Sequence, residues 1–345
     1  MKPNIKFKSE NLLIFYWLAS LTIMTFMIIF IGGLTRLTDS GLSMVDWQPI
    51  LGTIPPITQN DWIAVFDQYK TSPEYQIVNK SMSLKEFKYI FWWEWFHRFF
   101  ARCIGLVFII PLIIFLYKRK ISKKLFYGLT LLFIFGFFQA FIGWWMVKSG
   151  LSEDPYVSSY RLAFHLTNAV IILSILFWLT LNSLGSNNIN FLPKNRLENF
   201  IICLILLLFI TIISGAFMAG SHAGQSFNTY PLMSGQLIPS DYFLEDMGIK
   251  NLFENTVAIN FNHRWLATFT FLLIILFIIY SYYSNKFKMY KFEILSIFIF
   301  SILQFLLGIL TLLTNVQIIL ASLHQINSVL LLASILLFYH SIKKQ

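Results

Sequence analysis

The sequence predicts an all-α polytopic membrane protein with eight transmembrane helices, arranged as two parallel-repeat four-helix bundles. Hydrophobic residues make up 57% of the chain and charged residues only 12%, against about 25% charged residues in a typical soluble domain. Apolar runs long enough to cross a bilayer core of about 30 Å recur along the chain. Similar motifs also recur in the two halves at nearly constant separations.

Eight apolar runs are expected to form the membrane-spanning helices. They lie near residues 11–33, 95–117, 124–147, 159–182, 197–218, 261–283, 292–314 and 317–340. The first run is too long for a signal-peptide core and lacks a small-residue cleavage site, so we interpret it as a span. Because the number of spans is even, both ends of the chain are expected on the same side.

The basic residues predict which side that is. Five segments, counted with the first residues of the spans that follow them, hold 15 of the 26 Lys and Arg residues but only three of the 16 acids: the N-terminal segment, 117–124, 193–196, 285–291 and the C-terminal tail. Basic loops of this kind face the cytoplasm or matrix, so both termini are expected there. The lack of a presequence favours a bacterial plasma (inner) membrane over a mitochondrial inner membrane. The basic residues are scattered in short loops, which argues against nucleic-acid binding.

An internal repeat divides the chain into predicted units at residues 1–190 and 191–345. WFHRFFARCIGL (95–106) matches FNHRWLATFTFL (261–272), and AFHLTNAVIILS (163–174) matches SLHQINSVLLLAS (322–334). Gln-x-x-x-Gly also occurs in both units, and IGGLTRL (31–37) has a fainter echo in ISGAFMAG (213–220). Because each unit has four spans, both units are expected to enter the membrane in the same direction.

The repeat supplies four candidate metal ligands: His97, His165, His263 and His324. His97 and His263 are expected in the first turn of their helices, and the other two lie one or two turns inside the same face. Two imidazoles on neighbouring helices of a bundle suit axial ligation of haem iron. A lone histidine near a helix end is more often an interfacial hydrogen-bonding residue, but four at matched positions indicate function. Zinc is the rival metal, yet no Cys or carboxylate cluster completes a tetrahedral site.

The other polar residues near these motifs carry weaker predictions. Arg98 and Arg264 follow two of the histidines and are candidates to pair with haem propionates, or else to reach lipid headgroups. The repeated glycine of Gln-x-x-x-Gly either lets a flat macrocycle approach the backbone or serves ordinary helix packing. His222 and His340 have no repeat partner and are expected to be structural or surface residues.

One acid distinguishes the two units. Glu94 lies one helical turn before His97, whereas Asn260 occupies the matching position before His263. We therefore predict that the first unit performs chemistry, with Glu94 in proton transfer or in holding a nucleophile, and that the second unit stores or passes an electron. The alternative is that Glu94 only stabilises the positive end of the helix dipole.

Together these residues resemble the haem A synthases, in the subtype of mitochondria and alphaproteobacteria. The resemblance rests on WWEWFHR (92–98), GGLTRLTDSGLSMVDWQPILGTIPP (32–56), FHLTNA, LHQINS and the eight spans, and it covers essentially the whole chain. It implies an oxidoreductase that acts on a CH group, oxidising a ring methyl of haem O to a formyl group to give haem A for cytochrome oxidase. It further implies that His97 and His165 face the substrate haem, that Glu94 is catalytic, and that His263 and His324 bind haem b.

One departure and several alternatives remain at this point. Relatives of the other subtype carry a cysteine pair in the first outer loop, and this loop has none, so electron transfer through such a disulfide is not expected. A di-haem b-type electron carrier or quinol oxidase at the outer face is the main alternative, and a transporter is a second. The sequence does not decide whether the protein works alone, as a homo-oligomer, or beside haem O synthase or a cytochrome oxidase assembly factor.

Overall fold

The computed structural model of the protein describes residues 9–47, 51–152, 154–184, 189–283 and 286–344, and most of these residues are helical. Within these ranges there is no β-strand, only an isolated bridge between Met233 and Gln236. The predicted all-α class is confirmed.

Eight helices in the described ranges are long and apolar enough to cross a membrane, as predicted. They are α1 (Ser9–Leu37), α4 (Leu84–Tyr117), α5 (Lys123–Gly150), α6 (Ser159–Ser183), α7 (Arg196–Gly220), α9 (Thr256–Tyr283), α11 (Lys291–Leu313) and α12 (Ile318–Lys343). Each expected span falls within one of these helices, with two one-residue exceptions. Residue 314 lies just beyond the end of α11, and residue 317 just before the start of α12.

Helix α4 begins well before its apolar run. The Ser83 side chain accepts a hydrogen bond from the Glu86 N–H, and the Glu86 carboxylate accepts one from the Ser83 N–H, which is a capping box. The hydropathy pattern marks only the apolar part of the helix and misses these earlier turns. The expected first-turn positions are therefore wrong. His97 lies 13 residues after the start of α4, and His263 lies seven residues after the start of α9.

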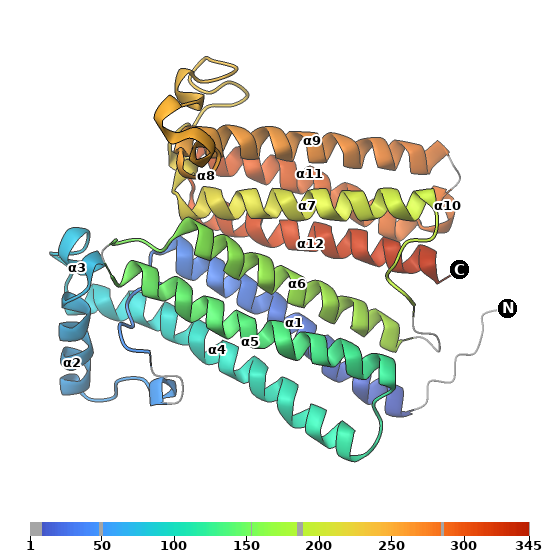
Figure 1. Ribbon diagram of the computed structural model, residues 1–345, viewed down its shortest axis with the longest axis horizontal. Coiled ribbons are helices and arrows are strands. Elements are labelled where there is room, and N and C mark those ends of the chain that lie inside the picture. Colours follow the sequence, from blue (N-terminus) through green and yellow to red (C-terminus); the bar gives the residue numbers. More distant parts are fainter. Residues whose placement is uncertain (1–8, 48–50, 153, 185–188, 284–285, 345) are drawn as a thin grey trace.

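The helices form two groups (Figure 1). In the first group α1 packs against α4 and α6, and α5 packs against α6. In the second, α7 packs against α9 and α12, and α11 packs against α9 and α12. The groups meet where α6 contacts α7 and α12, and where α1 contacts α12. This arrangement suits two four-helix units, although the internal repeat itself stays a prediction.

The two groups share a hydrophobic core. Its largest cluster of buried residues takes side chains from α6 of the first group and from the helices of the second, including Val170, Leu173, Ile201, Leu208, Ile297, Leu332 and Tyr339. Because the cluster crosses the boundary, each group buries part of its apolar surface against the other.

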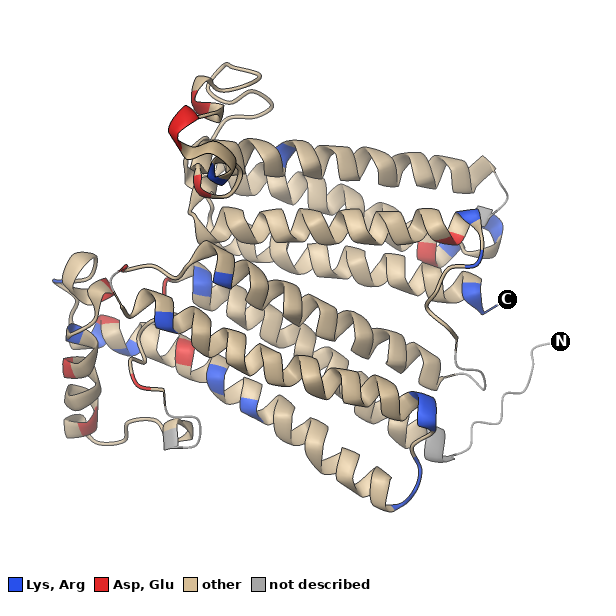
Figure 2. Cartoon of the chain, viewed as in Figure 1, with Lys and Arg blue, Asp and Glu red and all other residues tan. Residues whose placement is uncertain are grey.

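Both long connections lie at one end of the molecule (Figure 1), away from the end of α12. The first contains η1 (Leu51–Thr53), α2 (Gln59–Lys70) and α3 (Pro73–Ile77). The second contains η2 (Ala223–Gln225), η3 (Ser240–Tyr242), η4 (Glu245–Lys250) and α8 (Asn251–Glu254). The short α10 (Lys286–Met289) connects α9 to α11. Figure 2 shows acidic residues concentrated at the end with the long connections. We refer to it below as the acidic end.

Candidate functional site

A cavity of about 940 Å³ lies among the eight long helices and reaches the acidic end. All four predicted histidine ligands line it, as do Glu94, Arg98 and Arg264. Its volume is near the top of the usual range for cofactor and small-molecule sites, about 300–1,000 Å³. The fold therefore brings every predicted site residue to one cavity.

Each of the four imidazole rings lies against a glycine on another helix of its group. A β-carbon at the glycine would lie 3.2 Å from His97 (at Gly32), 3.0 Å from His165 (at Gly143), 3.2 Å from His263 (at Gly215) and 2.9 Å from His324 (at Gly308). Carbon atoms in contact prefer about 3.5–4.0 Å, so each glycine makes the space that its imidazole fills. At Gly143 and Gly308 this contact fits the expected role in helix packing, and the approach of a macrocycle to the glycine stays a prediction.

Two of the histidines are held by matching amide chains. The Gln139 side-chain nitrogen lies 3.2 Å from Nε2 of His165, and its oxygen accepts a hydrogen bond of 2.7 Å from Asn168. In the second group Gln304, Asn327 and His324 repeat this chain, with Asn327 donating to Gln304 at 2.9 Å. The asparagine fixes the orientation of the glutamine amide, so that its N–H groups face the imidazole. We missed both asparagines in the sequence, although the spacing His-x-x-Asn is the same in FHLTNA and LHQINS.

The other two histidines differ in their support. The Ser214 hydroxyl donates to the Thr211 carbonyl at 2.8 Å and lies 2.7 Å from Nδ1 of His263. Since its proton is already used, the Ser214 oxygen accepts the Nδ1 proton and leaves the Nε2 lone pair of His263 for a metal. His97 has no comparable hydrogen bond among the described residues, and Gly32 occupies the place of Ser214 in the repeat.

Glu94 is buried and joins α4 to the segment that follows α1. Its carboxylate accepts hydrogen bonds from Ser43 Oγ at 2.7 Å and from the Met44 N–H at 2.9 Å, and it pairs with Arg98 at 2.5 Å. Three donors thus occupy a group that has about four acceptor positions. One acceptor position of Glu94 is left over from these three contacts, and the residue lines the cavity.

The matching Asn260 has the reverse hydrogen-bonding polarity toward its own connecting segment. Its amide donates to the Ala223 carbonyl at 2.6 Å, while its oxygen accepts from Arg264 at 2.6 Å. The segment after α1 therefore presents donors, whereas the segment after α7 presents an acceptor. This contact explains in physical terms why an acid stands at one position and an amide at the other.

Arg98 and Arg264 both bind backbone carbonyls of these segments. Arg98 donates to the Met44 carbonyl at 3.3 Å, and Arg264 donates to the carbonyls of Phe227 and Thr229, both at 2.7 Å. Much of each guanidinium is therefore occupied by the protein itself. The pairing of Arg98 and Arg264 with haem propionates stays a prediction. It requires guanidinium N–H groups that do not already donate to these carbonyls.

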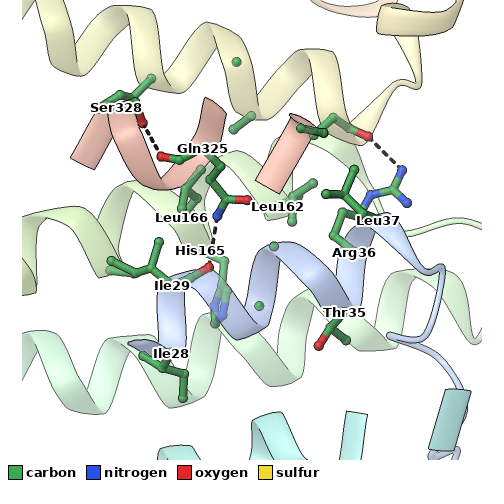
Figure 3. Close-up of a pocket in the computed structure, with 18 of the residues that line it drawn as sticks. Ile28, Ile29, Thr35, Arg36, Leu37, Leu162, His165, Leu166, Gln325 and Ser328 are labelled. Carbon is green, nitrogen blue, oxygen red and sulfur yellow. Dashed lines mark hydrogen bonds between the residues drawn. The ribbon is translucent and has the colours of Figure 1, made fainter. Parts of the chain in front are cut away.

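Other polar contacts join the two groups beside the cavity. The Gln325 side chain donates to the Ile29 carbonyl of α1 at 3.0 Å (Figure 3). Arg36 donates to the Ala219 carbonyl at 2.7 Å and lies 2.8 Å from Nε2 of His222. Burial, together with the Arg36 charge, lowers the pKa of His222. The expected structural role of His222 fits these contacts.

His340, on α12, is the other histidine that has no counterpart in the repeat. Nε2 of buried His340 donates to Asn182 Oδ1 at 3.1 Å, which joins α12 to α6. Within the described residues no group of three or more His, Cys, Asp or Glu side chains could hold a metal. The candidate ligands are thus the two histidine pairs in the cavity.

Comparison with known proteins now identifies the family. Residues 15–336 match the COX15-CtaA family, described as cytochrome oxidase assembly proteins. The chain belongs to this family. The resemblance seen in the sequence motifs is thereby confirmed.

Several relatives of this COX15-CtaA protein are named haem A synthase. The one from Nitrosospira multiformis is 41% identical over 333 residues, covering 95% of this chain and 93% of its own. The one from Flavobacterium johnsoniae is 40% identical over 346 residues, covering 98% and 100%. The one from Wolbachia pipientis wMel is 38% identical over 346 residues, covering 100% and 97%. None of these three is named an electron carrier, so that alternative is not favoured. The membership and the eight apolar helices together make the chain a multi-pass membrane protein.

Proposed function

We propose that this protein is a haem A synthase, which oxidises a ring methyl of haem O to a formyl group and so supplies haem A to cytochrome oxidase. The observation that carries the proposal is one cavity with two histidine pairs in a chain of the COX15-CtaA family. Relatives that cover nearly the whole chain carry the name haem A synthase. The activity belongs to the oxidoreductases that act on CH groups.

The two units are proposed to hold different haems. Haem O is the substrate of the unit at residues 1–190, between His97 and His165. Haem b is the cofactor of the unit at residues 191–345, between His263 and His324. The different support of the histidines favours this assignment. Ser214 fixes His263, as suits a permanently bound group. His97 has no such anchor in the described residues, as suits a ligand that must release its product.

The histidines present fit a haem. Each ring is placed by a glycine at its side, and the Ser214 contact leaves Nε2 of His263 free to bind iron. When bound, haem b supplies one-electron transfer. Arg264 and Arg98 are proposed to meet propionates through the N–H groups that the backbone carbonyls leave unused.

The overall reaction defines what the protein residues must do. A methyl group and one water give a formyl group, four protons and four electrons, in two successive two-electron oxidations. We propose that water supplies the oxygen and that a one-electron acceptor takes up the electrons. A haem held by His263 and His324 would supply the one-electron transfer to that acceptor. Glu94 is proposed to accept a proton from the attacking water at its remaining acceptor position, while Ser43, Met44 and Arg98 hold that carboxylate still.

The proposed location is the bacterial plasma membrane, with both termini in the cytoplasm. The acidic end would then face outward, which fits the basic residues of the short loops. Haem O synthase and a cytochrome oxidase assembly factor are the proposed candidate partners, and a homo-oligomer is to be tested beside them.

Acid extraction and chromatography of the haems from the purified protein tests the proposal. The cells used must also make haem O. Haem B together with haem O or haem A is the expected result. Two equivalents of haem B alone would support the di-haem electron carrier instead, and no haem would contradict the role of the four histidines. In the same assay Glu94→Gln is expected to retain haem but to form no haem A.

A further inference from the structure

A second buried acid reaches the cavity from outside the membrane-spanning helices. Glu74 belongs to α3 in the first long connection, which lies at the acidic end (Figure 1). It is 5% exposed and lines the same cavity as Glu94 and His97. Neither the family membership nor the sequence motifs assign it a role.

The surroundings of Glu74 hold its carboxyl in place without an ion pair. The Tyr69 hydroxyl donates to Oε2 of Glu74 at 2.9 Å and itself accepts from the Asn79 amide at 2.8 Å. Tyr69 is fully buried and packs on Phe87 and Tyr75. Among the described residues no Lys, Arg or His pairs with Glu74. A buried carboxyl with a single hydroxyl donor is costly to ionise.

The protonation of Glu74 follows from this setting. The pKa of Glu74 is raised to about 8, chiefly by burial; the charges of Glu94 and Asp39 also raise it, whereas the Tyr69 hydrogen bond and the Arg36 charge lower it. The group thus exchanges its proton close to physiological pH, where transfer in either direction costs little. Glu74 is protonated below about pH 8 and becomes a proton acceptor as the pH rises through that value.

A second acid near Glu74 is exposed to solvent. Asp39 lines the cavity and its charge acts on Glu74, yet its own side chain is 57% exposed. It lies two residues beyond the end of α1, where Arg36 pairs with it at 2.6 Å. The cavity wall therefore contains a buried acid near the chemistry and a second acid in contact with solvent.

We propose that Glu74 accepts protons released in the cavity during methyl oxidation and returns them to the aqueous phase at the acidic end by way of Asp39. The proposal rests on the proposed haem A synthase function, which releases four protons per formyl group. Each transfer converts the Glu74 carboxylate to the acid and then restores it, and Glu74 carries no electrons. Glu94 accepts the proton of the attacking water, whereas Glu74 transfers the released protons out of the cavity.

The test compares Glu74→Gln with Asp67→Asn and the unchanged protein. Asp67 is a matched acid in the same connection, but its side chain is 58% exposed on α2. Conversion of haem O to haem A is measured across pH, with haem content measured in parallel. The unchanged protein and Asp67→Asn are expected to convert faster as pH rises through about 8. Glu74→Gln is expected to retain haem, to convert at least about tenfold more slowly and to lose this pH dependence.

The outcomes separate the two proposals. Equal rates and equal pH profiles in Glu74→Gln and the unchanged protein would overturn the role of Glu74 alone. No conversion by the unchanged protein would count against the proposed function itself.

Two further measurements do not depend on how fast Glu74→Gln turns over. Infrared spectra of the full-length protein should contain a protonated carboxyl C=O band that is lost above about pH 8 and is missing in Glu74→Gln; no such band would overturn the proposal. Tyr69→Phe removes the hydrogen bond that lowers the Glu74 pKa. The band and the rate profile should both move to higher pH in that variant, and an unmoved profile would overturn the proposal.

Discussion

A methyl group added at Gly308 is expected to loosen haem at the second histidine pair. The new carbon in Gly308→Ala would lie 2.9 Å from Cε1 of His324, whereas such atoms prefer about 3.5–4.0 Å. The imidazole must therefore move by about 0.6–1.1 Å, beyond the tolerance of about 0.5 Å for a preorganised site. Displacing the support of a metal ligand typically costs about 10–100-fold in affinity, or about 1.4–2.7 kcal/mol.

The assay follows haem content of the purified protein and the rate of haem loss to an excess of a haem-scavenging apoprotein. Ser334→Ala, on the same helix as His324, is the control, because the Ser334 hydroxyl only donates within its own helix and the residue does not line the cavity. Alanine is the most favoured residue in a helix, by up to about 1 kcal/mol over glycine, so general destabilisation is not expected from either change. Equal haem content and equal loss rates in the two variants would refute the reasoning.

Three further predictions test the contacts around the cavity. Ser214→Ala should weaken haem b retention by about 10–100-fold, while Ser334→Ala, whose hydroxyl only donates within its own helix, should not change it; haem-loss rates compare the two. Asn260→Glu should lower the free energy of unfolding by about 1–3 kcal/mol, because a carboxylate cannot donate to the buried Ala223 carbonyl as the Asn260 amide does. Chromatography should detect no extra haem A in this variant. Gln325→Leu should cost about 0.5–1.5 kcal/mol through loss of its bond to the Ile29 carbonyl, seen as a lower unfolding midpoint with unchanged haem content.

The membrane helices were predictable because a bilayer imposes a minimum apolar length that composition alone reveals. The start of α4 was not, since its first turns are polar enough to escape a hydropathy pattern and are specified by the Ser83 capping box. Helices marked by the length of an apolar run, and histidines marked by a repeated motif, were found. Residues placed by local capping were missed.

The same distinction holds in the cavity. The four histidines were predictable because each has a counterpart in the other half. Asn168 and Asn327 also occupy matching positions in the two halves, but each acts by donating to a glutamine on another helix. A motif within one helix does not reveal a contact with a residue on another helix. Glu74 has no counterpart and reaches the cavity only through the packing of α3, so no sequence pattern marked it.

The opposite polarity of the two connecting segments limits how the halves can change. Ser43 and Met44 require an acceptor at position 94, and the Ala223 carbonyl requires a donor at position 260. Replacing Glu94 by Asn, or Asn260 by Glu, without changing the segment leaves a buried donor or acceptor without its partner. Such a single substitution destabilises the protein before it can bring a new activity. Moving the catalytic role from one half to the other would need the helix residue and its segment to change together. That coupling makes the division of labour hard to reverse by single substitutions, and it identifies helix and segment as the unit to transplant in any attempt to build a protein with two oxidising sites.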